Sequence, residues 1–202
     1  MKKALYAVLT ILAAACGSNT KETQLVNRPE GKVLVVYYSE SPNKNTGTVA
    51  QWIHEVAGGD IHEIVMVNPY TGGYSDVVKK AREDFNNNIF PAIVPFDKNL
   101  ADYDVIFIGS PVWFGTYALP LSTFLAENDF RGKTIVPFAT HGGGGAGKFY
   151  DDIRKNALGT NIKPGFTAKG SNQIERRIGR GTKNKINKYD VIVWLNEVFA
   201  AD

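Results

Sequence analysis

The chain has 202 residues, of which 44% are hydrophobic and 21% charged, as in a folded globular protein and unlike a disordered or collagen-like one. Its formal net charge is +3, and removing Lys2 and Lys3 leaves 21 of the 23 basic residues against 20 acidic ones. A balance so close to neutral produces no broad positive field, so no binding of nucleic acid is expected.

The N-terminus has the pattern of an export signal. Lys2 and Lys3 precede an apolar run over residues 4–15, which ends at Cys16, the only cysteine. The run is too short to span a bilayer, and small residues precede Cys16, as a signal peptidase requires. Residues 1–16 resemble a bacterial lipoprotein signal; an ordinary secretory peptide and an uncleaved anchor are the alternatives. The resemblance implies export to the bacterial cell envelope and attachment to a membrane only through a lipid on Cys16.

Residues 17–31 contain few apolar side chains and end in Pro29, Glu30 and Gly31. Such a segment buries too little surface to fold alone, so it is expected to be a flexible tether. The folded domain is therefore expected to span residues 32–202.

Apolar runs and amphipathic segments alternate along this domain. Its first run, Val33–Tyr38, is apolar throughout, which is typical of a strand buried on both faces of a parallel sheet. Strands are predicted over 33–38, 61–67, 104–110, 133–140 and 162–168, and helices over 48–57, 74–87, 119–127, 148–158 and 191–200. This alternation predicts an α/β fold, a doubly wound five-stranded parallel sheet with helices on both faces. Ligands of such sheets bind at the carboxyl ends of the strands, so the loops after the first, third and fourth strands carry the functional prediction.

The first of these loops, residues 39–48, is rich in hydroxyl and amide side chains. Its candidate binding residues are Ser39, Ser41, Asn43, Asn45 and Thr46. Together with the backbone N–H groups of the following helix they predict a site for a phosphate, to which Lys44 would add charge. An ordinary helix cap is the alternative, although a cap needs only one such residue.

The second loop, residues 110–120, is aromatic. Its candidate residues are Pro111, Val112, Trp113, Phe114 and Gly115. Aromatic side chains at the carboxyl end of a strand can stack on a planar ring of a ligand, or they can close the end of the core.

The third loop, residues 140–148, contains five glycines. Its candidate residues are Thr140, His141, Gly142, Gly143 and Gly144. Glycines allow a backbone to approach a ligand closely, and we expect N–H groups of this loop to face the polar edge of a flat ring. The segment also fits two nucleotide-binding patterns, but Phe149 stands where a phosphate loop needs Ser or Thr, and neither pattern follows the first strand.

From Lys32 to Ala200 the chain resembles the flavodoxin-like family, in particular a bacterial branch with Y-F-S-x-T-G-N-T, P-x-W-W-G and T-S-G-G-S-G loops. The matching residues are Tyr38, Ser39, Asn45, Thr46, Pro111, Trp113, Gly115, Thr140, Gly142 and Gly143. The resemblance implies strand order 2-1-3-4-5 and flavin mononucleotide (FMN) as cofactor. Three features depart from the branch: two more residues separate Ser39 from Asn45, His141 replaces a serine, and Phe114 replaces a tryptophan.

With the lipoprotein signal, the implied FMN favours an electron carrier at the membrane surface, which exchanges electrons with a redox partner protein or a small-molecule donor or acceptor. An FMN reductase that uses NAD(P)H or a quinone is the first alternative, and a flavin-free interaction protein on the same fold is the second. No catalytic acid, base or nucleophile is assigned, because the flavin itself supplies the redox chemistry. No metal site is expected, since His54, His62 and His141 lie on different predicted elements.

Residues 174–188 hold six basic side chains against Glu175 alone. This segment is either a solvated loop or a patch that docks an acidic redox protein or an anionic membrane surface.

Overall fold

The computed structural model describes residues 27–158, 161–170 and 187–200. Cys16, most of the predicted tether and most of the basic segment lie outside these residues. The strands are β1 (Val33–Tyr37), β2 (Asp60–Glu63), β3 (Val105–Trp113), β4 (Thr116–Tyr117), β5 (Thr134–His141), β6 (Asn161–Ile162) and β7 (Phe166–Lys169). The helices are α1 (Asn45–Ala57), α2 (Tyr74–Asn86), α3 (Leu119–Glu127), α4 (Phe149–Asn156) and α5 (Lys188–Val198), with a single 3-10 turn at Leu100–Asp102.

The sheet has the order β2-β1-β3-β5-β6, and every neighbouring pair along this path is parallel. This confirms the predicted fold and strand order. The predicted fifth strand is interrupted, because β6 and β7 both pair with β5 and are separated by residues 163–165. Pro164 lies in this gap, where its missing N–H cannot contribute to the ladder.

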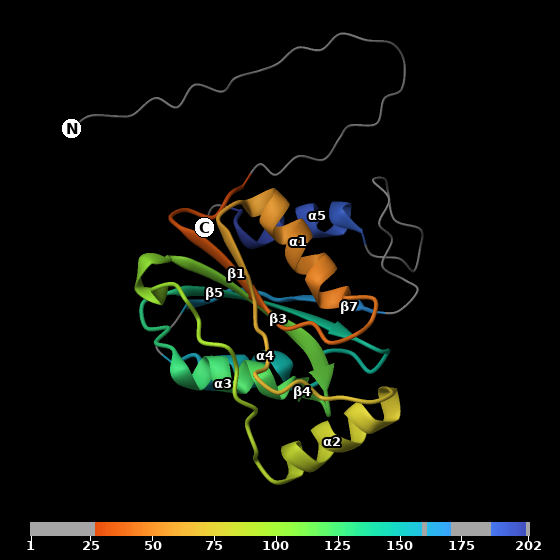
Figure 1. The fold of residues 1–202 in the computed structure, drawn as a ribbon. Coiled ribbons are helices and arrows are strands. Elements are labelled where there is room, and N and C mark those ends of the chain that lie inside the picture. Colours follow the sequence, from red (N-terminus) through yellow and green to blue (C-terminus); the bar gives the residue numbers. More distant parts are fainter. Residues whose placement is uncertain (1–26, 159–160, 171–186, 201–202) are drawn as a thin grey trace, which may run out of the picture.

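Helices cover both faces of the sheet, with α1 and α5 on one side and α3 and α4 on the other (Figure 1). The alternation of side chains along each strand supplies both layers. Val33 and Val35 of β1 pack under α1 and α5, whereas Leu34 and Val36 face the other side. The apolar run therefore forms a strand buried on both faces, as expected for a parallel sheet.

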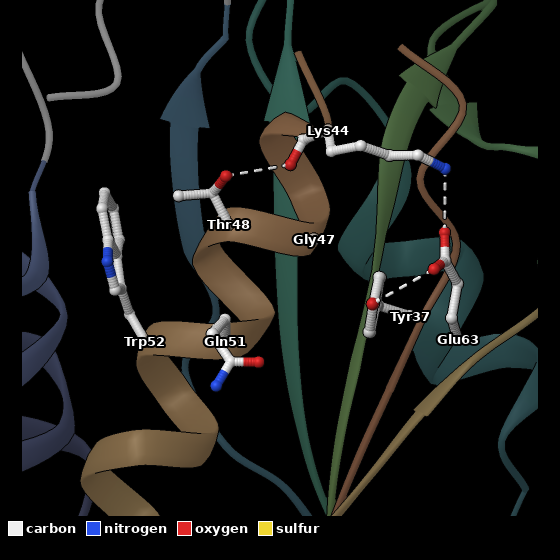
Figure 2. A pocket seen from close by; sticks show the side chains of 7 residues that line it. All are labelled: Tyr37, Lys44, Gly47, Thr48, Gln51, Trp52 and Glu63. Carbon is white, nitrogen blue, oxygen red and sulfur yellow. Dashed lines mark hydrogen bonds and ion pairs between the residues drawn. The ribbon is translucent and has the colours of Figure 1, made fainter. Parts of the chain in front are cut away.

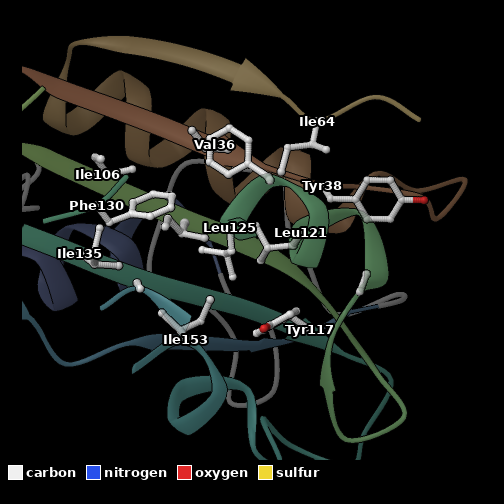
Figure 3. Packing of buried hydrophobic residues seen from close by; sticks show 14 of the residues in the cluster. Val36, Tyr38, Ile64, Ile106, Tyr117, Leu121, Leu125, Phe130, Ile135 and Ile153 are labelled. Atoms are coloured by element: carbon white, nitrogen blue, oxygen red, sulfur yellow. The ribbon is translucent and has the colours of Figure 1, made fainter. Parts of the chain in front are cut away.

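The core beneath α3 is built from neighbouring strands. Val36, Ile106 and Ile135 have no exposed surface, and they belong to one cluster with Leu121 and Leu125 of α3 (Figure 3). Burying an aliphatic side chain of this size contributes about 1.5–3 kcal/mol. This packing and the parallel pairing hold β1, β3 and β5 side by side, with their carboxyl ends at one edge of the sheet.

Helix α2 differs from its neighbours because it lies beyond the carboxyl end of β3, beside β4 (Figure 1). Only Ala81 and Asp84 of this helix are buried. The predicted second strand divides before it: β2 ends at Glu63, and Met66 then pairs antiparallel with Ile93. The chain thus leaves the sheet after β2 and, beyond α2, pairs with its own outgoing segment.

The N-terminal end of the described chain lies against the domain. The backbone N–H of Asn27 donates to Oδ1 of Asn196 in α5 at 3.1 Å, and its side-chain amide donates to the Asn196 carbonyl at 2.9 Å. The backbone N–H of Lys32 donates to Asp104 at 2.7 Å. The chain therefore enters the domain at the amino end of β1, opposite the loops at the carboxyl ends (Figure 1).

Candidate functional site

Two serines hold the first turn of α1. Ser39 is 2% exposed, and its Oγ accepts the N–H of Gly47 at 3.2 Å. The Oγ of Ser41 accepts the N–H of Asn45 at 3.4 Å. A hydroxyl that accepts a hydrogen bond keeps its own proton for donation, and the first turn of α1 contains no acidic residue. Hydroxyl donors at such a helix N-terminus suit a phosphate.

Thr46 and Thr140 join the first loop to the third. Their Oγ1 atoms lie 2.8 Å apart, and the two residues are 2% and 3% exposed. Thr140 also pairs with Pro111 in the β3–β5 register. One end of the sheet therefore brings residues from all three predicted loops together.

Lys44 lies on the other side of this loop, contrary to the expectation that it would add charge to the phosphate site. Its Nζ donates to the Ser39 carbonyl at 2.7 Å and pairs with Glu63 at 3.0 Å (Figure 2). β2, which carries Glu63, flanks β1 on the side opposite β3. The open cleft of about 410 Å³ that Lys44 lines with Tyr37 and Trp52 therefore lies on the β2 side of β1.

Pro111, Val112 and Trp113 belong to β3 itself and not to a loop, because the strand continues to Trp113. The chain turns at Phe114 and Gly115, with φ of 54° and 87°, and returns as β4. A two-residue hairpin with positive φ at both positions matches the twist of the strands. Phe114 tolerates this conformation at a steric cost that glycine avoids.

Trp113 and Phe114 have different surroundings. The half-buried Trp113 ring and the Tyr38 ring form a T-shaped contact at 5.7 Å between centroids, and the Tyr70 ring centroid lies 6.1 Å from that of Trp113. Phe114 contacts α2, with the Phe85 ring at 5.2 Å and the Arg82 guanidinium 4.0 Å above its own ring. Trp113 thus belongs to the body of the domain, whereas Phe114 attaches α2 to it.

The sequence did not single out Tyr70, Arg82 or Phe85. Arg82 and Phe85 lie in a segment with helical periodicity, but periodicity carries no information about where a helix docks. Their contacts with Phe114 are made at the positive-φ turn, whereas Tyr70, which precedes the helix, lies beside Trp113.

The glycine loop is folded around His141, the last residue of β5. Its Nδ1 accepts the N–H of Gly143 at 3.0 Å and that of Gly145 at 3.1 Å. A Cβ atom added to Gly142 or Gly144 would meet nothing within 4 Å. The N–H groups of this loop were predicted to face a ligand, but those of Gly143 and Gly145 bind His141 instead. Open space lies beside Gly142 and Gly144.

Two further glycines, Gly147 and Gly170, shape the site and were not among the predicted site residues. The N–H of Lys148 donates to the Gly115 carbonyl at 2.7 Å, and a Cβ on Gly147 would lie 2.3 Å from that oxygen. The N–H of Gly170 donates to the His141 carbonyl at 2.7 Å, and a Cβ there would lie 2.6 Å from the Asn45 amide nitrogen. At Gly147 two backbones approach so closely that glycine is required, whereas at Gly170 the missing Cβ leaves room for the Asn45 amide.

Glu40, the acidic side chain of the first loop, accepts a hydrogen bond from within the site. The Tyr38 hydroxyl donates to Glu40, and burial, followed by this hydrogen bond, raises the pKa of Tyr38 far above its ordinary value. Burial also lowers the pKa of His141, with a smaller contribution from Lys169. At neutral pH the site therefore presents a neutral tyrosine and a neutral histidine.

Within residues 27–158, 161–170 and 187–200, no group of His, Cys, Asp and Glu side chains is arranged to hold a metal ion. None of the helices in this part of the chain is both long and apolar enough to cross a bilayer.

Known proteins share this architecture. The Flavodoxin family model matches residues 32–193. A protein from Bacteroides eggerthii assigned as a flavoprotein superposes with a TM-score of 0.68 at 28% identity, over 86% of this chain and 100% of that one. A second protein assigned as a flavoprotein, from Bacteroides uniformis, superposes with a TM-score of 0.62 at 30% identity, over 70% of this chain and 92% of that one. A flavoprotein from Lactobacillus acidophilus in complex with FMN gives 0.57 at 27% identity, over 68% and 92%.

Proposed function

Because the chain belongs to the flavodoxin family, we propose that it binds FMN at these three loops and carries electrons at a membrane surface. The observation that carries the proposal is the convergence of the loops, which meet where Thr46 contacts Thr140 and where Thr140 pairs with Pro111. Two findings support FMN as the cofactor: the match to the Flavodoxin family, and the similarity to the Lactobacillus protein that was crystallised with FMN.

The residues at the carboxyl end fit the three chemical parts of FMN. Ser39, Ser41 and Thr46 offer hydroxyls at the start of α1, and no acidic residue in its first turn opposes a phosphate. Trp113 offers an aromatic face, and open space beside Gly142 and Gly144 admits the edge of a ring. Bound FMN supplies the redox chemistry, whereas the protein binds it, orients it and sets its surroundings.

An electron carrier needs no acid or base of its own. The hydroxyl of Tyr38 is bonded to Glu40, and the Nδ1 of His141 is occupied by loop N–H groups. These hydrogen bonds are compatible with a carrier, and a reductase that uses NAD(P)H or a quinone remains the alternative. The electron donor or acceptor is a partner protein or a small molecule.

Attachment through a lipid on Cys16 belongs to the same proposal. The described chain enters the domain at the amino end of β1, whereas the proposed FMN site lies at the carboxyl ends (Figure 1). A tether at the entry point therefore leaves the site open to a partner on the far side of the domain.

Titration of the purified mature protein with FMN tests the proposal. Flavin fluorescence should be quenched as the ring enters the site, and the melting temperature should rise because the ligand binds only the folded state. If the fluorescence and the melting temperature both stay unchanged, the chain is a flavin-free interaction protein. NAD(P)H oxidation by the FMN-loaded protein, with and without a quinone, then separates the two redox roles: steady turnover would contradict the carrier.

A further inference from the structure

The glycine loop is anchored internally by one imidazole nitrogen. Nδ1 of His141 accepts two backbone N–H groups, those of Gly143 and Gly145. A nitrogen that accepts hydrogen bonds carries no proton, so the neutral ring holds its proton on Nε2. Protonation would place a hydrogen on Nδ1, opposite both donors, and would break both hydrogen bonds.

This anchor acts on a segment that has no other side chain to order it. Residues 142–145 are four consecutive glycines, and glycine loses more conformational entropy on ordering than any other residue. Gly143 and Gly145 also adopt φ of 140° and 76°. The ends of the loop are held by β5 and by the bond from Lys148 to Gly115, but its middle is held by His141.

We propose that His141 is a positioning residue that folds the glycine loop for the flavin ring, so that flavin binding requires the unprotonated imidazole. This proposal rests on the FMN site proposed above. It gives a specific role to His141, which stands where the flavodoxin-like branch that this chain resembles has a serine.

The charges around His141 act in one direction. Among the described residues, Lys169 on β7 is the charged group that acts on His141, with which it pairs in the β5–β7 register. The loop 142–147 has no ionisable side chain, and Thr140, Asn45 and Thr46 are uncharged. Burial and Lys169 both lower the pKa of His141 below its ordinary value of 6.5.

The sign of the pH dependence follows. Well above pH 6.5 the ring is neutral whether or not the loop is folded, and the folded loop is fully available. As the pH falls through the lowered pKa, a proton must be released before the loop can form. Flavin affinity should then fall about tenfold for each further pH unit, because one proton is linked to binding.

His141→Asn is the matched control, since its amide oxygen can accept both N–H groups without titrating. FMN affinity should be measured from about pH 5 to about pH 8 for the mature parent, His141→Asn and His141→Ala. The phosphate of FMN itself titrates near pH 6, but it does so in all three proteins. The ratio of parent to His141→Asn affinity therefore isolates His141.

We expect this ratio to be constant at neutral pH and to fall in acid, while His141→Ala binds weakly throughout. Nitrogen NMR of the flavin-free protein supplies an independent readout: Nδ1 should be unprotonated, and the Gly143 and Gly145 amide signals should shift as His141 titrates. A constant or rising ratio in acid would overturn the role of His141. Intact NMR signals without FMN binding in any of the three proteins would instead overturn the proposed function.

Discussion

Thr46 and Thr140 are 94 positions apart in the chain, yet their hydroxyl oxygens lie 2.8 Å from each other inside the domain. One hydroxyl proton forms this bond, so a single proton of the pair remains for donation to a ligand. The start of α1 and the end of β5 thus contribute one shared donor to the proposed phosphate site.

Thr46→Val should weaken FMN binding by about 1.5–3 kcal/mol, the usual contribution of a hydrogen bond to a charged group. Riboflavin, which lacks the phosphate, should lose much less affinity. Parallel fluorescence titrations of both ligands measure the difference. Equal losses for the two ligands would place the phosphate elsewhere.

Thr140→Val is the control for this substitution. Each single variant leaves a buried hydroxyl without its partner, which costs about 1–3 kcal/mol of folding stability, whereas the double variant removes both groups. The two stability losses should therefore be strongly non-additive. Additive losses would show that the contact contributes little.

The sequence predicted the fold well because its signals were local. The apolar run of β1 and the polar loop after it could be read directly, and the order of alternating elements limits the topology. The position of α2 and the hairpin at Phe114 could not be read in this way. They depend on the antiparallel pairing of Met66 with Ile93 and on a positive φ at a residue other than glycine.

In the candidate site, too, features set by local sequence were predictable and features set by tertiary structure were not. Residue type predicts the hydroxyls of Ser39 and Thr46 as anion ligands, because hydroxyl donors suit a helix N-terminus. The direction of a long side chain was not predictable: Lys44 points to Glu63, away from the other loops. The double acceptor role of His141 likewise depends on the loop folding back onto its own anchor.

Trp113→Ala should weaken flavin binding by about 1–3 kcal/mol, the scale of an aromatic stack. Its contacts with Tyr38 and Tyr70 mean that the flavin-free protein should also lose stability. FMN titration and thermal unfolding of the flavin-free variant separate the two effects. A lowered melting temperature with intact affinity would show that Trp113 serves only the core.

Phe114→Ala is the matched comparison for Trp113. Phe114 contacts Phe85 and Arg82, so its loss should loosen α2 and speed hydrogen exchange there, with a smaller effect on flavin affinity. A larger loss of affinity than for Trp113→Ala would make Phe114 the stacking residue.

Lys44→Met should weaken FMN binding only a few-fold, because the Lys44 amino group bonds the Ser39 carbonyl and Glu63 and supports the first loop without facing the proposed phosphate site. The Lys44 and Glu63 side chains are 58% and 36% exposed, so their ion pair contributes at most about 1 kcal/mol. Glu63→Gln removes the ion pair but leaves the bond from Lys44 to Ser39, and should have a smaller effect. A loss of more than about tenfold for FMN, with riboflavin unaffected, would mean that Lys44 contacts the phosphate directly.

Cys16 should carry the lipid. Mass spectrometry of membrane-extracted protein should find acyl mass on an N-terminus that begins at Cys16, because the modified cysteine is the first residue after cleavage of a lipoprotein signal. Cys16→Ser should accumulate as an unlipidated precursor. A soluble product cleaved at another residue would contradict the prediction.

Gly109→Ala should destabilise the sheet at its centre. Gly109 pairs with Phe138 across β3 and β5, and a Cβ on Gly109 would lie 2.1 Å from two carbons of the Phe138 ring. Phe138 has no exposed surface, so its ring cannot move without disturbing the packing under α1 and α5. Overpacking of this kind costs about 1–3 kcal/mol, measurable by denaturant unfolding. Phe138→Leu should offset part of that loss in the Gly109→Ala background, although on its own it removes packing. If the two losses simply add, the ring and the glycine are not in the contact described.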